Sequence, residues 1–279
     1  MKIMSSNIRK NNIELWDRNR GTIRSSIGGW KVGEAVYNHG YSMMDDFVGK
    51  ISYMQLIMLN ATGRLPERKI ADWVEQVHIC MSWPDSRIWC NQIGALAGTN
   101  RASVIAATSA GLLANDSRSY GTKTIVEGVE FIQSAMNQYK RGLSADEIVK
   151  NECAKHGGKP HIMGYARPIA KGDERIPAME AVQKSLDIPF GDHQVLAYKI
   201  NDILSRDFDA TINFNGYLSA VLTDNDFTPR ELYRLLAILV SSGITACYVD
   251  CMDKPAESFF TQRCDDIEYI GKPIRKFPE

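Results

Sequence analysis

The residues of this chain that could do chemistry lie around the stretch IMGYARPIAKGDERIP, residues 162–177. It reads as a glycine-containing turn, then a basic residue, then an acidic–basic couple that opens a helix, a layout typical of loops that place a side chain over a substrate. The stretch holds no histidine or cysteine, and its only acidic groups are Asp173 and Glu174. Histidine titrates near neutrality, so His161, just before the stretch, is the best acid–base candidate. Its alternative is an exposed loop imidazole.

Charge and composition argue against several classes of partner. The 279 residues include 33 basic and 33 acidic side chains, so the formal net charge is zero. Nucleic acids and anionic membranes attract basic surfaces, and we expect neither as the main partner. The first residues, MKIMSSNIRKNN, lack the apolar core of a signal peptide, and no apolar run approaches the roughly 20 residues that span a bilayer. We expect a cytoplasmic protein that acts on a small molecule.

The cysteines give no metal-binding pattern. The six thiols form no CxxC pair and have no histidine at ligand spacing, so we expect no zinc and assign no metal. Scattered cysteines of this kind are typically reduced and buried.

Helical periodicity dominates the chain. The expected helices cover residues 67–83, 101–113 (buried), 124–139, 144–157 and the stretch that begins at 228. The last two begin with capping boxes, S-A-D-E and T-P-R-E. Residues 232–249 are apolar on nearly every face, apart from a break at 241–243, which is typical of a helix buried centrally or against a partner subunit.

Strand signals are confined to residues 22–37, where three glycines favour a short β-hairpin. The sequence therefore predicts a mostly α-helical fold with one small hairpin near its N-terminus. We expect residues 1–279 to form a single unit, in which a smaller lobe at about 150–210 is inserted into a larger one.

Five segments, in order, resemble motifs of the citrate synthase superfamily, and most closely its short branch, citryl-CoA lyase. They are NHGYSMMDDFVGKISYMQLIMLNATGRLPE (38–67), SAGLLANDSRSYG (109–121), GYARPIAKGDER (164–175), DATINFNGYLSAVL (209–222) and FTQRCDDIEYIG (260–271). The resemblance implies a helical fold of large and small lobes, a homodimer formed through buried helices, and a cleft that closes over a CoA thioester and a keto acid.

The positions that depart from the family pattern bear on the chemistry. The aspartate of the family's "NVDG" motif falls at Asn213 and the histidine of "HGGA" at Tyr120. The histidine of "GFGHP" falls at Arg167, or at Ala166 if the register shifts by one. A further histidine, that of "DHG.P", falls at Ser82. The resemblance thus implies that the groups that polarise the carbonyl and move the α-proton are replaced, which argues against ordinary citrate chemistry.

Four residues are the catalytic candidates that follow from this alignment and from the loop: Arg167, Asn213, Tyr120 and His161. Arg167 could hold a carboxylate or an enolate oxygen, with an ordinary salt bridge as the alternative. Asn213 could donate its amide to a carbonyl oxygen and is also a good helix N-cap. Tyr120 could donate to an oxyanion or simply pack at a helix end.

The substrate-binding candidates are Arg175, Asp173, Tyr165, Ser82 and Cys90. Asp173 and Arg175 keep the "DPR" pattern of the family, with Glu174 in place of proline. They could bind a carboxylate, or they could cap a helix with a local ion pair. A lone buried cysteine such as Cys90 is usually inert.

Two kinds of function compete. We favour a biosynthetic enzyme that acts on a carbonyl or thioester substrate, β-keto or polyketide-like, and promotes condensation or cyclisation by stabilising an enolate or oxyanion. A CoA thioester is a candidate substrate, and no cofactor is assigned. The alternatives are a catalytically silent binding or interaction subunit and a genuine CoA-dependent C–C lyase.

Overall fold

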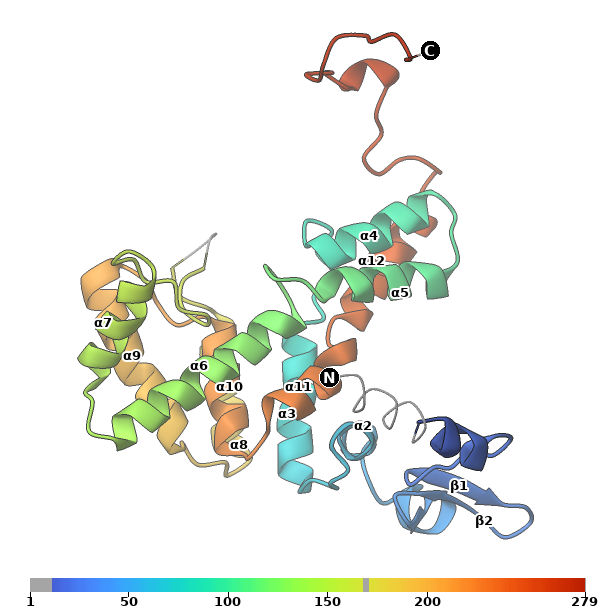
Figure 1. Cartoon of the computed structure of the whole chain (residues 1–279), viewed down its shortest axis with the longest axis vertical. Helices are drawn as coiled ribbons and strands as arrows, with labels where there is room; N and C mark the ends of the chain where they lie inside the picture. The colour runs from blue at the N-terminus through green and yellow to red at the C-terminus, as the bar shows by residue number, and fades with distance from the viewer. Residues whose placement is uncertain (1–11, 168–170, 279) are drawn as a thin grey trace, which may run out of the picture. The chain divides into compact units, whose positions relative to one another are not determined.

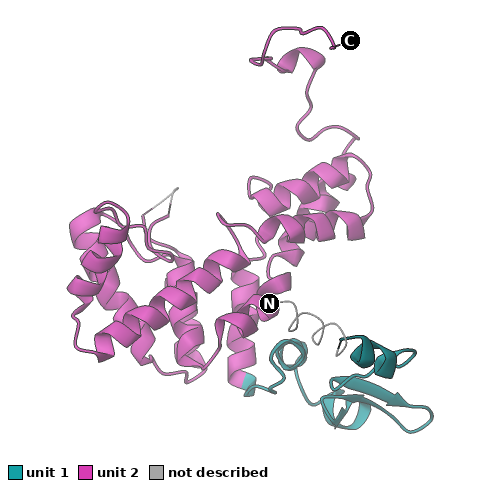
Figure 2. Ribbon diagram, in the orientation of Figure 1, with its two compact units in different colours: residues 1–68 teal, residues 69–279 magenta. Residues whose placement is uncertain are grey.

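The structure is a computed structural model that describes residues 12–167 and 171–278. Two compact units are defined, one within residues 1–68 and one within residues 69–279 (Figure 2). Part of the GYARPIAKGDER segment, residues 168–170, lies outside the described residues. The expected lobe at 150–210 stays a prediction.

The first unit holds a small antiparallel sheet followed by helical turns (Figure 1). Its elements are β1 (Gly28–Lys31), β2 (Ala35–Asn38), β3 (Tyr41–Ser42), the π-helix η1 (Met43–Phe47) and α2 (Tyr53–Thr62). Gly33 adopts φ +75° in the turn between β1 and β2, a conformation that favours glycine. The predicted hairpin is confirmed, and a third strand extends it.

Over the described residues of the second unit, the regular secondary-structure elements are all helices. They are α3 (Arg68–Cys80), α4 (Trp89–Thr99), α5 (Val104–Asn115), α6 (Thr122–Lys140), α7 (Ala145–Lys155), α8 (Arg175–Ser185), α9 (Asp192–Phe208), α10 (Phe214–Asp224), α11 (Pro229–Leu235), the short 3-10 helix η2 (Leu236–Ile238), α12 (Ser241–Met252) and the 3-10 helix η3 (Cys264–Asp266). Both predicted capping boxes are present, at the starts of α7 and α11. The mostly helical fold predicted from the sequence is therefore confirmed.

Helix α10 is the core of one part of this unit. Nine of its residues, Phe214 and Gly216–Thr223, are buried, and the helix packs against α6, α8 and α9. Tyr217 and Leu218 are almost completely enclosed. The N-terminal end of α10 is consequently held in a fixed position, which matters because the candidate site residue Asn213 caps it.

Helices α4, α5 and α12 form a second packed group, visible together in Figure 1. Glycines on α4 allow close contact with α12: a Cβ added at Gly94 would lie 2.5 Å from the Ile244 carbonyl oxygen, and one at Gly98 would lie 2.4 Å from that of Tyr248. The sequence predicts a break in the helix at 241–243. In the structure these residues form the first turn of α12, which begins at Ser241.

The expectation that α5 is a buried helix is wrong for one of its faces. Ile105 is 76% exposed and Leu113 is 78% exposed, whereas Ala107 and Gly111 are buried against α4 and α12. The apolar sequence predicted burial, but α4 and α12 cover only one side of the helix.

The continuous helical stretch Pro229–Met252 also corrects an expectation. Among the described residues it is the one helix long and apolar enough to span a membrane, with a mean hydropathy of 1.8, and half of it is buried inside the structure. Ser241 and Ser242 interrupt its apolar run in the sequence, although the helix continues through them. The core helix of a globular protein has the same properties, so this stretch alone does not assign a membrane location.

Substituting Gly98 by alanine should destabilise the second unit, because the added Cβ overlaps backbone that cannot move without shifting α12. We expect a loss of about 1–3 kcal/mol in the free energy of unfolding, measured by denaturant titration. Gly29→Ala, at a site with nothing within 4 Å of the added Cβ, is the control and should change stability little. Equal stability of Gly98→Ala and the wild type would contradict the packing described for α4 and α12.

Candidate functional site

A cavity of about 620 Å³ lies in the second unit, where the C-terminal end of α3, the start of α6, the 160–167 loop and the start of α10 converge. It is lined by Cys80, Met81, Trp83, Ile88, Ser119, Tyr120, Gly121, Thr124, Ile125, Pro160, His161, Ile162, Met163, Gly164, Tyr165, Ala166, Arg167, Asp173, Arg175, Asn213, Phe214, Asn215 and Leu218. All four residues predicted to be catalytic line it, together with three of the five predicted to bind substrate. The tertiary structure therefore brings together lining residues that are up to 138 positions apart in the sequence, from Cys80 to Leu218.

The loop is fixed by backbone pairing with the segment that enters α10. Ala166 N–H donates to the Thr211 carbonyl at 2.7 Å, and Asn213 N–H donates to the Gly164 carbonyl at 3.0 Å. Gly164 has φ +93°, and a Cβ there would lie 2.7 Å from the Cα of Gly216. Ala166 also adopts a positive φ, +73°, which is strained for a residue with a Cβ. The backbone next to Arg167 is thus held in one conformation.

Asn213 is confirmed as the N-cap of α10. Its Oδ1 accepts from the N–H groups of Asn215 and Gly216 at 2.9 and 3.2 Å, while its Nδ2 donates to the Ala166 carbonyl at 2.7 Å. One side chain therefore caps the helix and ties the loop to it. One amide hydrogen remains to donate to a ligand.

Asp173 and Arg175 form a buried ion pair. Arg175 donates through Nε and Nη2 to the two carboxylate oxygens at 2.8 and 2.7 Å, and the Phe214 N–H donates to Oδ2 at 2.9 Å. Burial of the Asp173 side chain, which is 0% exposed, opposes ionisation. The hydrogen bonds and charge of Arg175, with the Phe214 N–H, outweigh it, so the pKa of Asp173 lies below its ordinary value. Such a carboxylate stays ionised but is a poor base.

Arg167 is held by a neighbouring carboxylate of its own. Its Nη1 and Nη2 donate to Glu174 at 2.5 and 3.1 Å, and Nη1 also lies 4.0 Å from Asp173 Oδ1. The guanidinium is only 11% exposed, whereas the Glu174 side chain is 67% exposed. Arg167 therefore forms a salt bridge with Glu174 and also lines the cavity.

Tyr120 places a phenol in the cavity. Its ring meets Trp89 edge to face at 6.0 Å. Burial raises the pKa of Tyr120 to about 12, with a smaller opposing effect from the nearby Arg175 charge. The hydroxyl therefore keeps its proton at neutral pH and can act as a hydrogen-bond donor.

His161 is the histidine that reaches the lining. It is exposed at the rim, and its ring lies 5.0 Å from that of His156. His193 is paired with Asp224 at 2.8 Å, outside the lining. Burial lowers the pKa of His78 to about 4, and that side chain also lies outside the lining. No histidine–aspartate pair meets in the cavity among the described residues.

Three of the proposed substrate-binding residues have structural contacts that compete with that role. Tyr165 contributes to the lining, but its hydroxyl donates to the Ala197 carbonyl at 3.0 Å. Ser82 lies outside the lining and donates back to the His78 carbonyl at 2.5 Å. Cys90 is also outside it, and burial raises the pKa of its thiol.

The residues next to Ser82 are the ones that face the cavity, and sequence reasoning missed them. Cys80, Met81 and Trp83 line it, and Met81 Sδ and the Trp83 ring both contact Arg175, at 3.3 and 5.9 Å. Burial raises the pKa of the Cys80 thiol, which makes it a weak nucleophile at neutral pH. The signal that could have identified them was the Met and Trp side chains on either side of Ser82, which the sequence had placed at the pocket.

The polar side chains that line the cavity indicate which chemistry it can support. Its hydrogen-bond donors include two guanidiniums, the phenol of Tyr120 and the amide of Asn213. Among the described lining residues its carboxylate, Asp173, is paired with Arg175, and its imidazole lies at the rim. In the described part of the chain no three His, Cys, Asp or Glu side chains are placed to hold a metal ion. The arrangement can stabilise developing negative charge on oxygen.

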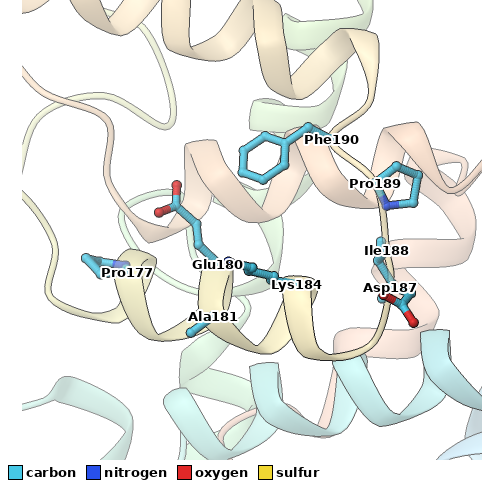
Figure 3. A pocket seen from close by; sticks show the side chains of 8 residues that line it. All are labelled: Pro177, Glu180, Ala181, Lys184, Asp187, Ile188, Pro189 and Phe190. Carbon is cyan, nitrogen blue, oxygen red and sulfur yellow. The ribbon is translucent and has the colours of Figure 1, made fainter.

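A second hollow, also of about 620 Å³, lies along α8 and the segment after it (Figure 3). It is lined by Pro177, Glu180, Ala181, Lys184, Asp187, Ile188, Pro189 and Phe190. Glu180 accepts a hydrogen bond from Tyr198. None of the predicted site residues reaches this hollow.

Comparisons with known proteins show the fold. No family model matches the sequence, and no curated protein matches it significantly. Among solved structures, citryl-CoA lyase from Hydrogenobacter thermophilus aligns with a TM-score of 0.76 at 23% identity, over 92% of this chain and 97% of that one. ATP citrate lyase from Methanothrix soehngenii, in complex with citrate and coenzyme A, aligns with a TM-score of 0.73 at 17% identity, over 95% of this chain and 44% of that one.

A citrate synthase shows the same relationship. The enzyme from Thermoplasma acidophilum, in a ternary complex with carboxymethyl coenzyme A and oxaloacetate, aligns with a TM-score of 0.62 at 17% identity, over 82% of this chain and 59% of that one. The chain therefore has a citrate synthase-like fold, and its predicted likeness to short citryl-CoA lyase is confirmed at the level of the fold. The replacement of catalytic residues stays a prediction.

Replacing Asp173 by asparagine should destabilise the protein by about 3 kcal/mol at pH 7, because Arg175 would lose its buried counter-charge. The folded-state pKa of Asp173 is depressed, so its stabilisation is present above its unfolded pKa of about 4 and is lost as pH falls through the lower folded value. The difference in Tm between wild type and variant should shrink below pH 4. A constant difference from pH 7 to pH 3 would show that the Asp173 charge contributes nothing.

Proposed function

We propose that the chain is an enzyme that binds a carbonyl or thioester substrate in the cavity and stabilises enolate or oxyanion character, so that the substrate condenses or cyclises. The observation that carries this proposal is the convergence of Arg167, Asn213 and Tyr120 on one largely apolar cavity. Each of them can donate to an oxygen atom, and none is a base at neutral pH.

A β-keto thioester suits such a site. Its α-carbon lies between two carbonyl groups, so its proton is acidic enough to need no strong protein base, and His161 at the rim can accept it. Holding the reacting atoms in line lowers the barrier further, by about 7–11 kcal/mol in the best intramolecular cases. The structural neighbours that are in complex with coenzyme A or carboxymethyl coenzyme A make a CoA thioester the first candidate.

Tyr120→Phe should test the oxyanion role, because it removes one protonated donor and little volume. We expect kcat on a β-keto thioester to fall by about 100-fold with KM nearly unchanged, as for other single oxyanion donors. Tyr53→Phe, the same change at a residue that is 75% exposed, is the matched control and should retain full activity.

The substrate screen for this measurement should include CoA, acyl-CoAs, oxaloacetate, citrate and β-keto thioesters, with thermal shift as the binding readout. Efficient cleavage of citryl-CoA that is sensitive to the Tyr120 change would contradict the proposal in favour of a genuine C–C lyase. Absence of binding and turnover with every compound would favour the catalytically silent subunit.

The exposed face of α5 supports a homodimer. Ile105 and Leu113 project from one face of this apolar helix, with exposed fractions of 76% and 78%, and the small residues between them permit close helix packing. A second copy of the chain can cover this face symmetrically.

Glutamate at Ile105 and Leu113 should convert a dimer into a monomer, because association would then bury unpaired charges. Light scattering coupled to size exclusion measures the mass directly. Ile79→Glu, at an isoleucine of α3 that is 60% exposed, is the control and should leave the mass unchanged. A wild-type protein that is monomeric at micromolar concentration would exclude the dimer.

A further inference from the structure

We propose that the acyl group bound in the cavity is uncharged and apolar, and that Glu174 enforces this selectivity by occupying the guanidinium of Arg167. This inference rests on the proposed function, since it names the class of substrate for the same cavity. It concerns the acyl part of the ligand rather than its activating group.

The charges at the cavity are already balanced within the chain. The lining carries two guanidiniums, Arg167 and Arg175, and one carboxylate, Asp173. Glu174, immediately outside the lining, completes a second ion pair, so two cations face two anions. A ligand carboxylate would enter a site with no net positive charge to attract it.

Arg175 is not available as a carboxylate clamp. Nε and Nη2 are both directed at Asp173, Nη1 lies 3.3 Å from Met81 Sδ, and the guanidinium stacks 4.6 Å from the Phe214 ring centroid. Displacing Asp173 would leave a side chain that is 0% exposed with an unpaired charge, which is strongly unfavourable. This cation is therefore a fixed part of the wall.

Arg167 could be released more easily, because its partner is a surface residue. Glu174 is 67% exposed and would return to water if it were displaced, whereas Arg167 itself is 11% exposed. The two terminal nitrogens that would form a fork to a ligand carboxylate are the ones that Glu174 occupies. A carbonyl oxygen needs only one hydrogen bond and can use a remaining N–H without breaking the pair.

The rest of the lining favours an apolar group. Trp83, Ile88, Ile125, Met163 and Leu218 face the same cavity. Burying hydrocarbon against such side chains is favourable, whereas burying a carboxylate there without a partner is costly. Resident Glu174 thus acts as an intramolecular competitor specifically against carboxylated acyl groups.

A pair of ligands of equal shape tests this inference. The amide analogues of succinyl-CoA and 4-methylpentanoyl-CoA, in which NH replaces the thioester sulfur, differ only in a terminal carboxylate against an isopropyl group. By calorimetry, the wild type should bind the 4-methylpentanoyl analogue at least about tenfold more tightly. Glu174→Ala should improve the Kd of the succinyl analogue by about tenfold or more, the size expected for a freed charged hydrogen bond, and change the other by less than about threefold.

Glu130→Ala, at an exposed glutamate of α6 outside the lining, is the matched control. Glu174→Gln, which removes the charge but keeps the shape, should show the same direction of change if the alanine variant unfolds. The inference would be overturned if the wild type bound the succinyl analogue as tightly as the other analogue or more tightly. It would also be overturned if neither Glu174 substitution improved the Kd of the succinyl analogue. Either result would leave the proposed function unaffected. Failure of both analogues to bind any variant would overturn the proposed function and the inference with it.

Discussion

The buried carboxylate of Asp173 is the interaction on which the cavity depends. Through its hydrogen bonds to Arg175 and to the Phe214 N–H, it joins the loop to the starts of α8 and α10. A charge with no exposed surface is stable only while both partners are in place. The same contacts that keep Asp173 ionised also orient Arg175 across the cavity wall. A substitution at Asp173 would therefore change both the stability of the fold and the charge of the site.

The backbone around this ion pair leaves little freedom. Gly164 and Gly216 approach so closely that neither tolerates a Cβ, and Asn213 uses its amide to connect the loop to the cap of α10. Ala166 has a positive φ of 73° although it carries a Cβ. Strain of this kind persists only when the surrounding contacts determine the conformation, and here they fix the direction of Arg167.

The fold and the site carry different information about function. The citrate synthase-like fold is shared with an ATP citrate lyase in complex with citrate and coenzyme A and with a citrate synthase in complex with carboxymethyl coenzyme A and oxaloacetate. The cavity of this chain has no His–Asp pair among its described residues, and both of its guanidiniums are already paired within the chain. A shared fold does not by itself fix the chemistry, which depends on the side chains that line the cavity.

The sequence by itself determined the two capping boxes, the hairpin, the resemblance and the helices α3, α5, α6, α7 and those from α11 onward, because periodicity and capping are local properties. The family motifs placed Arg167, Asn213 and Tyr120 at one site, and the position of His161 beside the loop added that residue. It did not distinguish Ser82 from its neighbours Cys80, Met81 and Trp83, because the direction of a side chain beyond a helix end depends on the backbone of that turn. Only the tertiary structure decided that Glu174 neutralises Arg167 and which face of α5 stays exposed, because both depend on how the loop and the helices pack.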